Sequence, residues 1–223
     1  MIYGEKFKIL SKKKRWLKVI TDFDKYIGYI KNKKYSNKFL ATHKIYTLKA
    51  NIFSFPKNSN KYKKNNKLPF GSKIEILKKY KKFIMFEKNK WVQVKNIKKY
   101  NSKEKDFFKI LNLFINCKYK WGGKSFDGID CSALLQMYYF YNNRYFPRDT
   151  KDQIKIKKGN KNLNSFVKGN IIYWKGHVAI CINSKKLIHA YGPKKKVLIM
   201  NIKDTIKIIE KTANLKVKKI IKI

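Results

Sequence analysis

The chain has 223 residues, a length that suffices for one large domain or for two to three small ones. Its residues are 43% hydrophobic and 15% aromatic, which excludes an intrinsically disordered protein, and no apolar run approaches the roughly 20 residues that a membrane span needs. Three cysteines, with no pair at metal-ligand spacing, exclude a disulfide scaffold and a zinc ribbon.

The net charge of +43 comes from 56 Lys and Arg residues against 13 Asp and Glu residues. Such an excess of cations attracts phosphate through counterion release, as in nucleic-acid binders. Arg occurs only at positions 15, 144 and 148, however, whereas phosphate and base recognition favours the guanidinium fork. Lys is instead spread along the whole chain together with Ile and Asn, and all three have A/T-rich codons. We therefore favour compositional drift over selection for a polyanion, and expect no specific nucleic-acid partner.

Short β-strands are predicted for two N-terminal segments, residues 1–39 and residues 40–99. The strands expected in the first segment are Lys6–Leu10, Trp16–Thr21 and Tyr26–Lys31. Those expected in the second are Ile45–Ala50, Ser72–Leu77, Phe83–Glu87 and Trp91–Val94, with a polar loop over residues 55–67. Both segments share an order of motifs, YGEKFKIL then WLKV in one, and FGSKIEIL then WVQV in the other. This weak internal repeat predicts two small all-β barrels of mostly antiparallel strands.

From residue 100 to residue 223 the pattern is that of an α+β domain. Apolar residues at helical spacing predict a helix from Phe107, with Ser102 as N-cap and Glu104 and Asp106 in its first turn. A Gly-rich loop, WGGKSFDGID, then leads into a buried helix with the sequence CSALLQMYYFY. Strands are predicted over the sequences NIIYW, HVAICIN, KLIHAY, VLIMNI and LKVKKII, with a short helix at Asp204–Glu210 before the last of them.

Cys131 opens the second predicted helix and is the candidate nucleophile. A thiol at a helix N-terminus meets the positive end of the macrodipole and unpaired N–H groups, which lower its pKa toward the reactive thiolate. The glycines of the preceding loop let the backbone fold tightly beside Cys131 and are expected to leave it accessible. Cys117, at a helix end, and Cys181, in the middle of an apolar strand, are expected to be structural.

A nucleophilic Cys needs a base, and the base needs a residue that orients it. The chain has three histidines, at positions 43, 177 and 189. A three-residue connection at Asn183–Lys185 would pair Ala179 with His189 and place His177 and His189 on one sheet face as diagonal neighbours. A connection of two or four residues would put them on opposite faces. Two strand histidines are on their own more often ordinary polar positions, and His43, which has no such partner, is expected to be structural.

Five motifs occur in order after residue 118. They are YKWGG at 119–123, DGIDCS at 127–132, PRDTKDQ at 147–153, GHVAI at 176–180 and IHA at 188–190. Together they resemble the NlpC/P60 family of cell-wall cysteine peptidases over roughly residues 102–223, which implies a papain-like α+β catalytic domain at residues 100–223. The segments before it resemble the bacterial SH3-type domains that precede this domain in one subgroup of the family, with the first of them shortened.

The resemblance implies roles for individual residues. Cys131 is expected to be the nucleophile, His177 the general base, and His189 the residue that holds His177 in the right tautomer. Tyr119 is expected to stabilise the oxyanion through its hydroxyl, together with the backbone N–H of Cys131. The positions assigned to the substrate are Asp130 and Ser132 for the γ-D-glutamyl group, Asp149 and Thr150 for a free L-Ala amine, and Trp121 in the cleft wall. On sequence grounds alone Asp130 is a turn residue and Asp149 a helix N-cap.

The implied activity is that of a cysteine endopeptidase that hydrolyses the γ-D-glutamyl–diamino acid bond, to meso-diaminopimelate or Lys, in peptidoglycan stem peptides with a free N-terminal L-Ala. The alternatives are a catalytically silent wall- or peptide-binding protein, a non-specific polyanion binder, and amidase or acyltransferase chemistry on the same fold. No metal or organic cofactor is implied, and the expected partner is a muropeptide. The N-terminus MIYGEKFKIL carries no visible export signal, which predicts a cytoplasmic protein; an upstream start codon would instead allow the periplasm or cell envelope.

Overall fold

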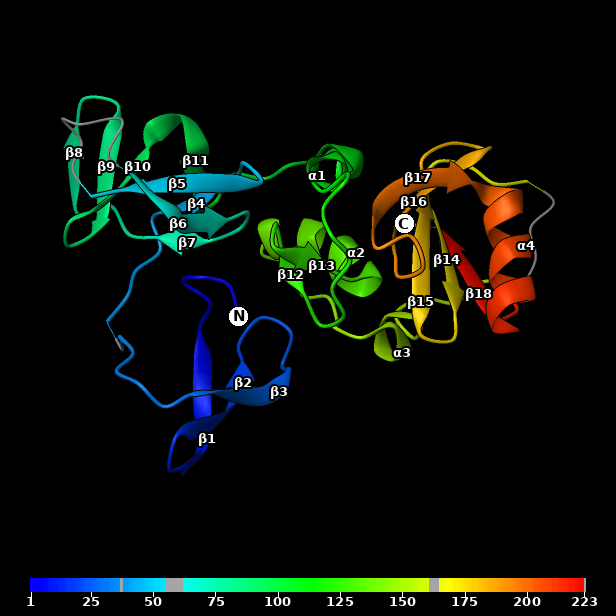
Figure 1. Cartoon of the computed structure of the whole chain (residues 1–223), viewed down its shortest axis with the longest axis horizontal. Helices are drawn as coiled ribbons and strands as arrows, with labels where there is room; N and C mark the ends of the chain where they lie inside the picture. Colours follow the sequence, from blue (N-terminus) through cyan, green and yellow to red (C-terminus); the bar gives the residue numbers. More distant parts are fainter. Residues whose placement is uncertain (37, 55–61, 161–164, 223) are drawn as a thin grey trace. The chain divides into compact units, whose positions relative to one another are not determined.

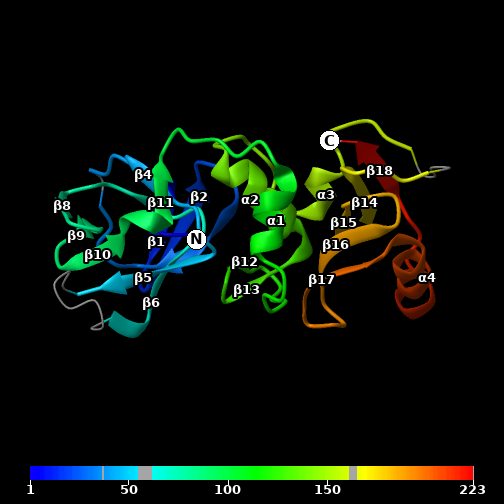
Figure 2. The same cartoon turned by 90° about the horizontal axis from the view of Figure 1, so that it is seen from above.

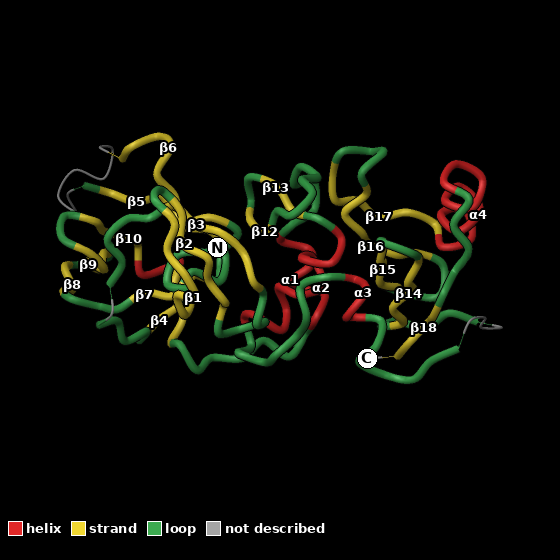
Figure 3. Tube along the Cα trace, turned by 90° about the horizontal axis from the view of Figure 1, so that it is seen from below, coloured by secondary structure: helices red, strands yellow, loops and turns green. Residues whose placement is uncertain are grey.

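The computed structural model describes residues 1–36, 38–54, 62–160 and 165–222 (Figure 1). They form two compact units, the first Met1–Lys103 with Phe140–Arg144, and the second Glu104–Tyr139 with Tyr145–Ile223. Strands dominate residues 1–103, whereas helices and strands both occur after them (Figure 3). In the described part of the chain, no helix combines the length and the apolar character needed to cross a membrane.

The N-terminal residues of the first unit form a three-stranded antiparallel sheet. Its strands are β1 (Phe7–Lys13), β2 (Trp16–Thr21) and β3 (Ile27–Lys31), in the order β1-β2-β3. All three predicted strands are confirmed, and β1 continues to Lys13 because a bulge between Ile9 and Ser11 absorbs an extra residue. Alternate residues of β2, namely Leu17, Val19 and Thr21, are buried, as expected for a strand with one face toward a core.

The rest of the first unit forms two further antiparallel sheets, with the strand orders β6-β5-β10-β9-β8 and β11-β4-β7. The strands are β4 (His43–Ile45), β5 (Lys49–Phe53), β6 (Tyr62–Pro69), β7 (Lys73–Ile74), β8 (Lys78–Tyr80), β9 (Phe83–Glu87), β10 (Lys90–Gln93) and β11 (Ile97–Lys99). Side chains from both sheets share one core, which includes Ile45, Ala50, Ile74, Ile84 and Val92. The antiparallel β prediction is confirmed, but within the described residues each sheet ends in two edge strands and none closes into a barrel.

Two details predicted for this segment are wrong. Residues Ile45–Ala50 are not one strand, because β4 ends at Ile45 and β5 begins at Lys49 in a different sheet. Residues 62–67 of the predicted polar loop belong to β6, whose backbone pairs with β5 through Lys67 and Asn51. Pairing uses backbone groups that every residue carries, so a polar sequence can still form an edge strand. Residues 55–61 of that loop lie outside the described residues.

The repeated motif gives two glycines the same backbone conformation. Gly4 in YGEK has φ +76° and Gly71 in FGSK has φ +78°, both in the left-handed region that favours glycine. At Gly4 a Cβ atom would also stand 2.2 Å from the carbonyl oxygen of Lys73, which excludes any side chain there. The internal repeat therefore corresponds to a shared local turn in the structure.

The second unit has a five-stranded antiparallel sheet with the strand order β17-β16-β15-β14-β18. Its elements are α1 (Phe107–Leu113), β12 (Lys124–Ser125), β13 (Gly128–Ile129), α2 (Cys131–Tyr141, of which the last two residues belong to the first unit), α3 (Thr150–Gln153), β14 (Asn170–Trp174), β15 (His177–Cys181), β16 (Lys186–Tyr191), β17 (Lys196–Asn201), α4 (Ile202–Ala213) and β18 (Lys219–Lys222). The sheet lies between α4 on one side and α1 and α2 on the other (Figures 1 and 2). The predicted order of helices before an antiparallel sheet is confirmed.

The helix boundaries differ slightly from the prediction. The N-cap of α1 is Asp106, not Ser102, and its side chain accepts a hydrogen bond from the backbone N–H of Phe108 at 3.0 Å. A capping side chain has to be the residue directly before the first turn, and Ser102 is too far upstream. Helix α4 begins at Ile202 because the side chain of Asn201 caps it, accepting from Asp204 at 3.3 Å.

Candidate active site

The start of α2 is fixed by Asp130, which directly precedes Cys131. The carbonyl of Asp130 accepts from the backbone N–H of Leu134 at 3.0 Å, and its Oδ1 accepts from the N–H of Ala133 at 2.8 Å. Asp130 is therefore the N-cap of the helix, and Cys131 is its first residue, as the sequence predicts. The cap holds the nucleophile candidate at the end of the helix where backbone N–H groups lack partners within the helix.

Two glycines bring the preceding loop against this helix start. Gly122 has φ +73°, and its backbone N–H donates to Oδ2 of Asp130 at 2.8 Å. A Cβ atom on Gly123 would stand 2.4 Å from the carbonyl oxygen of Gly128, so a side chain at this position would force the two backbones apart. The Gly-Gly pair is thus needed for one left-handed residue and one close approach, which places the loop beside Cys131.

Arg148 holds the helix start and the glycine loop in place, a role that the sequence did not predict. Its guanidinium binds the carboxylate of Asp130 through two parallel contacts of 3.0 and 2.7 Å, and also donates to Oγ of Ser132 at 2.9 Å. All three side chains are buried, with exposed fractions of 5 to 8%. The sequence does contain a feature that could have indicated this role. Arg148 is an Arg within a motif, in a chain where nearly all of the 56 basic residues are Lys. Only the Arg fork can bind a carboxylate at two points, so an Arg at this position suggests such a contact.

Asp130 and Ser132, which the family resemblance assigns to the substrate, are thus used within the protein. Ser132 donates to Oδ1 of Asp130 at 3.1 Å and accepts from Arg148. Asp130 accepts from donors on the glycine loop, on α2 and on Arg148. Their shared function in this structure is to hold the helix start, the loop and the residues after Pro147 together.

The sulfur of Cys131 lies against the backbone on both sides of His177. Its Sγ donates to the carbonyl oxygen of Gly176 at 3.9 Å, and the backbone N–H of Val178 donates to the sulfur. The residue is only 6% exposed, so the prediction that the glycine loop leaves it accessible is wrong.

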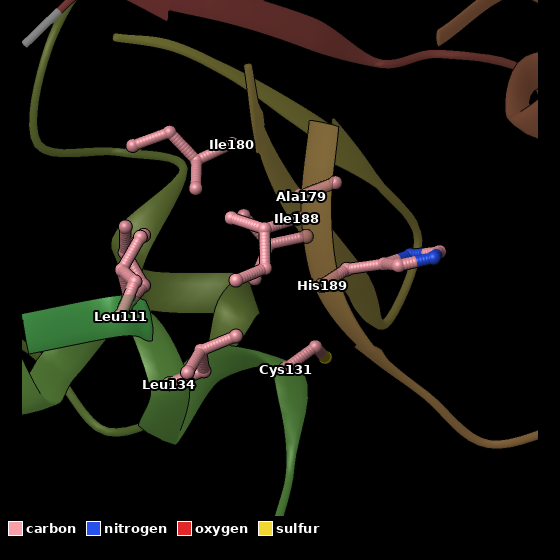
Figure 4. Close-up of a pocket in the computed structure, with 9 residues that line it drawn as sticks. Leu111, Cys131, Leu134, Ala179, Ile180, Ile188 and His189 are labelled. Carbon is pink, nitrogen blue, oxygen red and sulfur yellow. The ribbon is translucent and has the colours of Figure 1, made fainter. Parts of the chain in front are cut away.

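A cavity of about 10 Å³ lies beside Cys131 and His189, between the helices and the sheet (Figure 4). It is lined by apolar side chains that include Leu111, Leu134 and Ile188. The imidazole of His189 points away from these side chains (Figure 4). The cavity holds no more than about one water molecule, so it is a packing gap and not a substrate cleft.

The two strand histidines form a hydrogen-bonded pair. Strands β15 and β16 pair with Ile180 opposite Ile188, and this register places Ala179 opposite His189. The predicted three-residue connection is therefore confirmed, and Nε2 of His177 lies 2.9 Å from Nδ1 of His189. The ring of His189 is also stacked on Tyr191, at 4.7 Å and 11°, and is only 1% exposed. Packing thus leaves the pair little freedom to rotate.

Burial determines the protonation states of Cys131, His177 and His189. It lowers the pKa of His177 to about 4, and burial together with the neighbouring His177 lowers the pKa of His189 to about 3. Burial, reinforced by the carboxylate of Asp130, raises the pKa of Cys131 to about 11, although backbone N–H groups act in the opposite direction. The predicted lowering of the thiol pKa by the helix N-terminus is therefore wrong in net effect, because desolvation outweighs it. At neutral pH the site contains a thiol and two neutral imidazoles.

This charge state predicts how Cys131 reacts with iodoacetamide. Because the thiolate is the nucleophile, its alkylation rate should rise about tenfold per pH unit from pH 7 to pH 10 and level off only near pH 11. The rate is measured by mass spectrometry of the peptide that contains Cys131, with the peptide of the fully buried Cys181 as the unreactive control. A rate that is constant between pH 5 and pH 8 would indicate a preformed thiolate–imidazolium pair and contradict the assignment.

The other predicted site residues differ in their surroundings. Tyr119 is half-buried beside Gly192, and burial followed by the charges of Cys131 and Asp130 raises the pKa of its hydroxyl, which stays protonated at neutral pH. Asp149 occupies the N-cap position of α3, but its side chain makes no capping hydrogen bond. Thr150 follows it and is partly exposed, and Trp121 is 86% exposed.

Residues expected to be structural lie elsewhere. Cys117 and Cys181 are buried, and Cys181 belongs to the core between the sheet and α4. His43 is in β4 of the first unit, where its Nδ1 lies 3.1 Å from Oγ1 of Thr42. Among the candidate residues, the second unit brings together the titratable groups of Cys131, His177, His189 and Tyr119 and of the Asp130–Arg148 pair.

Comparison with known proteins identifies relatives of part of the chain. Residues 116–212 match the NlpC/P60 family. The chain is 35% identical to the Dipeptidyl-peptidase 6 of Lysinibacillus sphaericus over 79 residues, which are 34% of this chain and 28% of that protein. It is 30% identical to the Gamma-D-glutamyl-L-lysine dipeptidyl-peptidase of Bacillus subtilis (strain 168) over 102 residues, 42% of this chain and 34% of that protein. The matches thus span about a third or less of these curated relatives.

A solved structure shares the fold over most of the chain. The crystal structure of an NlpC/P60 family protein from Bacillus cereus superposes with a TM-score of 0.76 at 20% sequence identity. The similarity covers 91% of this chain and 76% of the other. Since it extends well beyond residues 116–212, the fold similarity includes elements of the all-β first unit as well.

Proposed function

We propose that the protein is a cysteine endopeptidase that cleaves the γ-D-glutamyl–diamino acid bond of peptidoglycan stem peptides, and the match of residues 116–212 to the NlpC/P60 family supports this proposal. The observation that carries the proposal is the position of the Cys131 sulfur, which contacts Gly176 and Val178 on either side of His177. His177 is in turn hydrogen-bonded to His189 at 2.9 Å. The name of the Bacillus subtilis relative supports the choice of the γ-D-glutamyl bond.

In the first half of the reaction, the sulfur of Cys131 attacks the γ-carbonyl carbon of the D-Glu residue. Its proton passes to the neutral His177 as the S–C bond forms, so no ion pair has to exist before the substrate binds. The developing oxyanion is stabilised by the hydroxyl of Tyr119 and the backbone N–H of Cys131. The protonated His177 then donates its proton to the leaving amine of the diamino acid, and a thioester remains on Cys131.

In the second half, water attacks the thioester and gives its proton to His177. The S–C bond breaks, the γ-carboxyl of the dipeptide is released, and the sulfur recovers its proton. His189 acts as a positioning residue throughout, because its hydrogen bond fixes the orientation of the His177 ring and stabilises the imidazolium that forms transiently. Every step uses groups of this chain and a water molecule.

The substrate is proposed to enter with a free L-Ala amine, bound by Asp149 and Thr150. The carboxylate of Asp149 makes no capping hydrogen bond with α3, so a helix cap does not account for it. An ammonium group is the natural partner of a carboxylate at a partly buried position. Trp121, with its ring largely exposed, is proposed to cover the bound peptide. Asp130 and Ser132 are proposed to line the γ-D-glutamyl position while they also fix the helix start.

The test uses L-Ala-γ-D-Glu-meso-diaminopimelate, its Lys analogue, and both peptides acetylated on the L-Ala amine. We expect cleavage only at the γ-D-glutamyl bond, identified by product mass, with acetylated peptides cleaved at least about tenfold more slowly, because an amide cannot pair with Asp149. In Asp149→Asn that preference should fall toward unity; Asp152→Asn, on the exposed part of α3, is the control. Equal rates for acetylated and free peptides would contradict the amine site, and cleavage at another bond would contradict the proposed activity.

A further inference from the structure

His189 has a second polar neighbour besides His177. Its Nε2 lies 3.3 Å from the thioether sulfur of Met200 in β17. The register pairs His189 with Leu198, so Met200 is the next residue of β17 on the same sheet face and a diagonal neighbour of the imidazole. Both ring nitrogens of this buried side chain therefore have a specific partner, one a histidine and the other a sulfur.

The thioether sulfur of Met200 determines which atom donates in the contacts of His189 with Met200 and with His177. A thioether carries no hydrogen and can only accept, so the contact with Met200 is a hydrogen bond only when Nε2 of His189 carries the proton. Both imidazoles are neutral at neutral pH, because burial holds the pKa of His177 near about 4 and that of His189 near about 3. A neutral ring has one N–H, so Nδ1 of His189 is then an acceptor, and Nε2 of His177 must be the donor to it.

These tautomers also determine which ring nitrogen of His177 can act as the base. If Nε2 of His177 carries its proton, Nδ1 of His177 carries the lone pair and is the nitrogen left to act as the base that the proposed function assigns to His177. In the opposite tautomer of His189, the Nδ1–H would donate to His177 instead. The proton of His177 would then sit on Nδ1, where it blocks the transfer from the thiol.

We infer that Met200 is a positioning residue of the site: its sulfur accepts the Nε2–H of His189 and thereby sets the tautomers of both histidines so that His177 presents an unprotonated Nδ1. The inference deepens the proposed function, in which His177 is the general base. It extends the hydrogen-bonded pair of His177 and His189 by one member, Met200. Met200 does not touch the substrate in this scheme.

The alternative role of Met200 is packing alone, since it also lies against the core between the sheet and α4. Met200→Leu separates the two roles, because Leu fills nearly the same volume but cannot accept a hydrogen bond. Leu198→Met is the matched control: it exchanges the same two side chains at the residue paired directly with His189 and leaves the sulfur of Met200 in place.

The first readout is the protonation state of the rings in the substrate-free protein, from ¹⁵N–¹H correlation spectra of the histidine side chains at pH 7. In the wild type we expect the proton of His189 on Nε2 and that of His177 on Nε2. In Met200→Leu the population of the Nδ1–H tautomer of His189 should rise at least about threefold, whereas Leu198→Met should match the wild type. A wild-type His189 protonated on Nδ1, or unchanged tautomers in Met200→Leu, would overturn the inference.

The second readout is kinetic, with the γ-D-glutamyl peptides described above. Met200→Leu should lower kcat about 3- to 10-fold and leave KM within twofold, because the lost hydrogen bond acts on proton transfer and not on binding. A change in KM with kcat unchanged would overturn the inference. The two proposals fail separately: a wild-type protein with the expected tautomers but no hydrolysis of any γ-D-glutamyl peptide would refute the peptidase, and active protein with the wrong tautomers would refute the role of Met200.

Discussion

Replacing Cys131 with Ala is expected to lower the rate of γ-D-glutamyl peptide hydrolysis by about 10⁴-fold or more. The substitution removes the atom that forms the thioester, and neither His177 nor the proposed oxyanion donors can replace it. The fold should persist, because the lost sulfur makes only weak hydrogen bonds, one to the carbonyl of Gly176 at 3.9 Å and one from the N–H of Val178, and the side chain remains small and apolar. Rates are measured by product mass, and folding by thermal unfolding followed with circular dichroism.

Cys181→Ala is the matched control for this experiment. It removes a sulfur of the same size from β15, the strand whose Val178 contacts Cys131, at a residue that is fully buried in the core beside α4. We expect it to keep most of the activity while losing about 1–2 kcal/mol of unfolding free energy, as a small cavity requires. Full activity in Cys131→Ala would end the peptidase proposal, and loss of activity in both variants would indicate a general defect of the sheet.

The second large effect is expected from Arg148→Met, which should lower the free energy of unfolding by about 3–5 kcal/mol. The substitution leaves the carboxylate of Asp130 buried without its cationic partner, which is much more costly than losing an exposed ion pair. Activity should fall with stability, because Asp130 also holds the glycine loop and the N–H groups at the start of α2. Chemical denaturation and peptide hydrolysis are measured on the same samples.

The control is Lys155→Met, which breaks the exposed ion pair with Asp152 and should cost no more than about 1 kcal/mol. Arg148→Lys is the informative intermediate. It keeps the charge but cannot make two parallel contacts with Asp130, so it should recover only part of the lost stability. Equal stability of Arg148→Met and the wild type would mean that the buried pair does not hold the helix start.

Much of the site could be predicted because its residues lie where local patterns begin or end. Cys131 follows an Asp at the first residue of an apolar helix, and that boundary is set by capping and by helical spacing within a few residues. His177 and His189 lie in consecutive strands, and their shared face follows from the length of one short connection. Such features depend on neighbours in the chain, so they need no knowledge of the tertiary fold.

The predictions that were wrong in the first unit concern pairing between strands, which does not depend on local side-chain patterns. Strand β6 contains few apolar residues, and its pairing with β5 comes from backbone groups that leave no trace in the side-chain pattern. Likewise, the sequence places strands within two segments but does not specify which of them pair, so open sheets and closed barrels look alike before the strand order is known.

The amino-acid sequence by itself determined that Cys131 opens a helix and that His177 and His189 share one sheet face, because these placements depend on side-chain type and on position within a helix or strand. Only the tertiary structure decided the protonation states of these residues and the contacts that support them. Arg148 reaches Asp130 across 18 positions, and Met200 reaches His189 from a neighbouring strand. The thiol pKa follows the burial of Cys131 and not the helix end alone, because desolvation sums over every segment that packs around the sulfur.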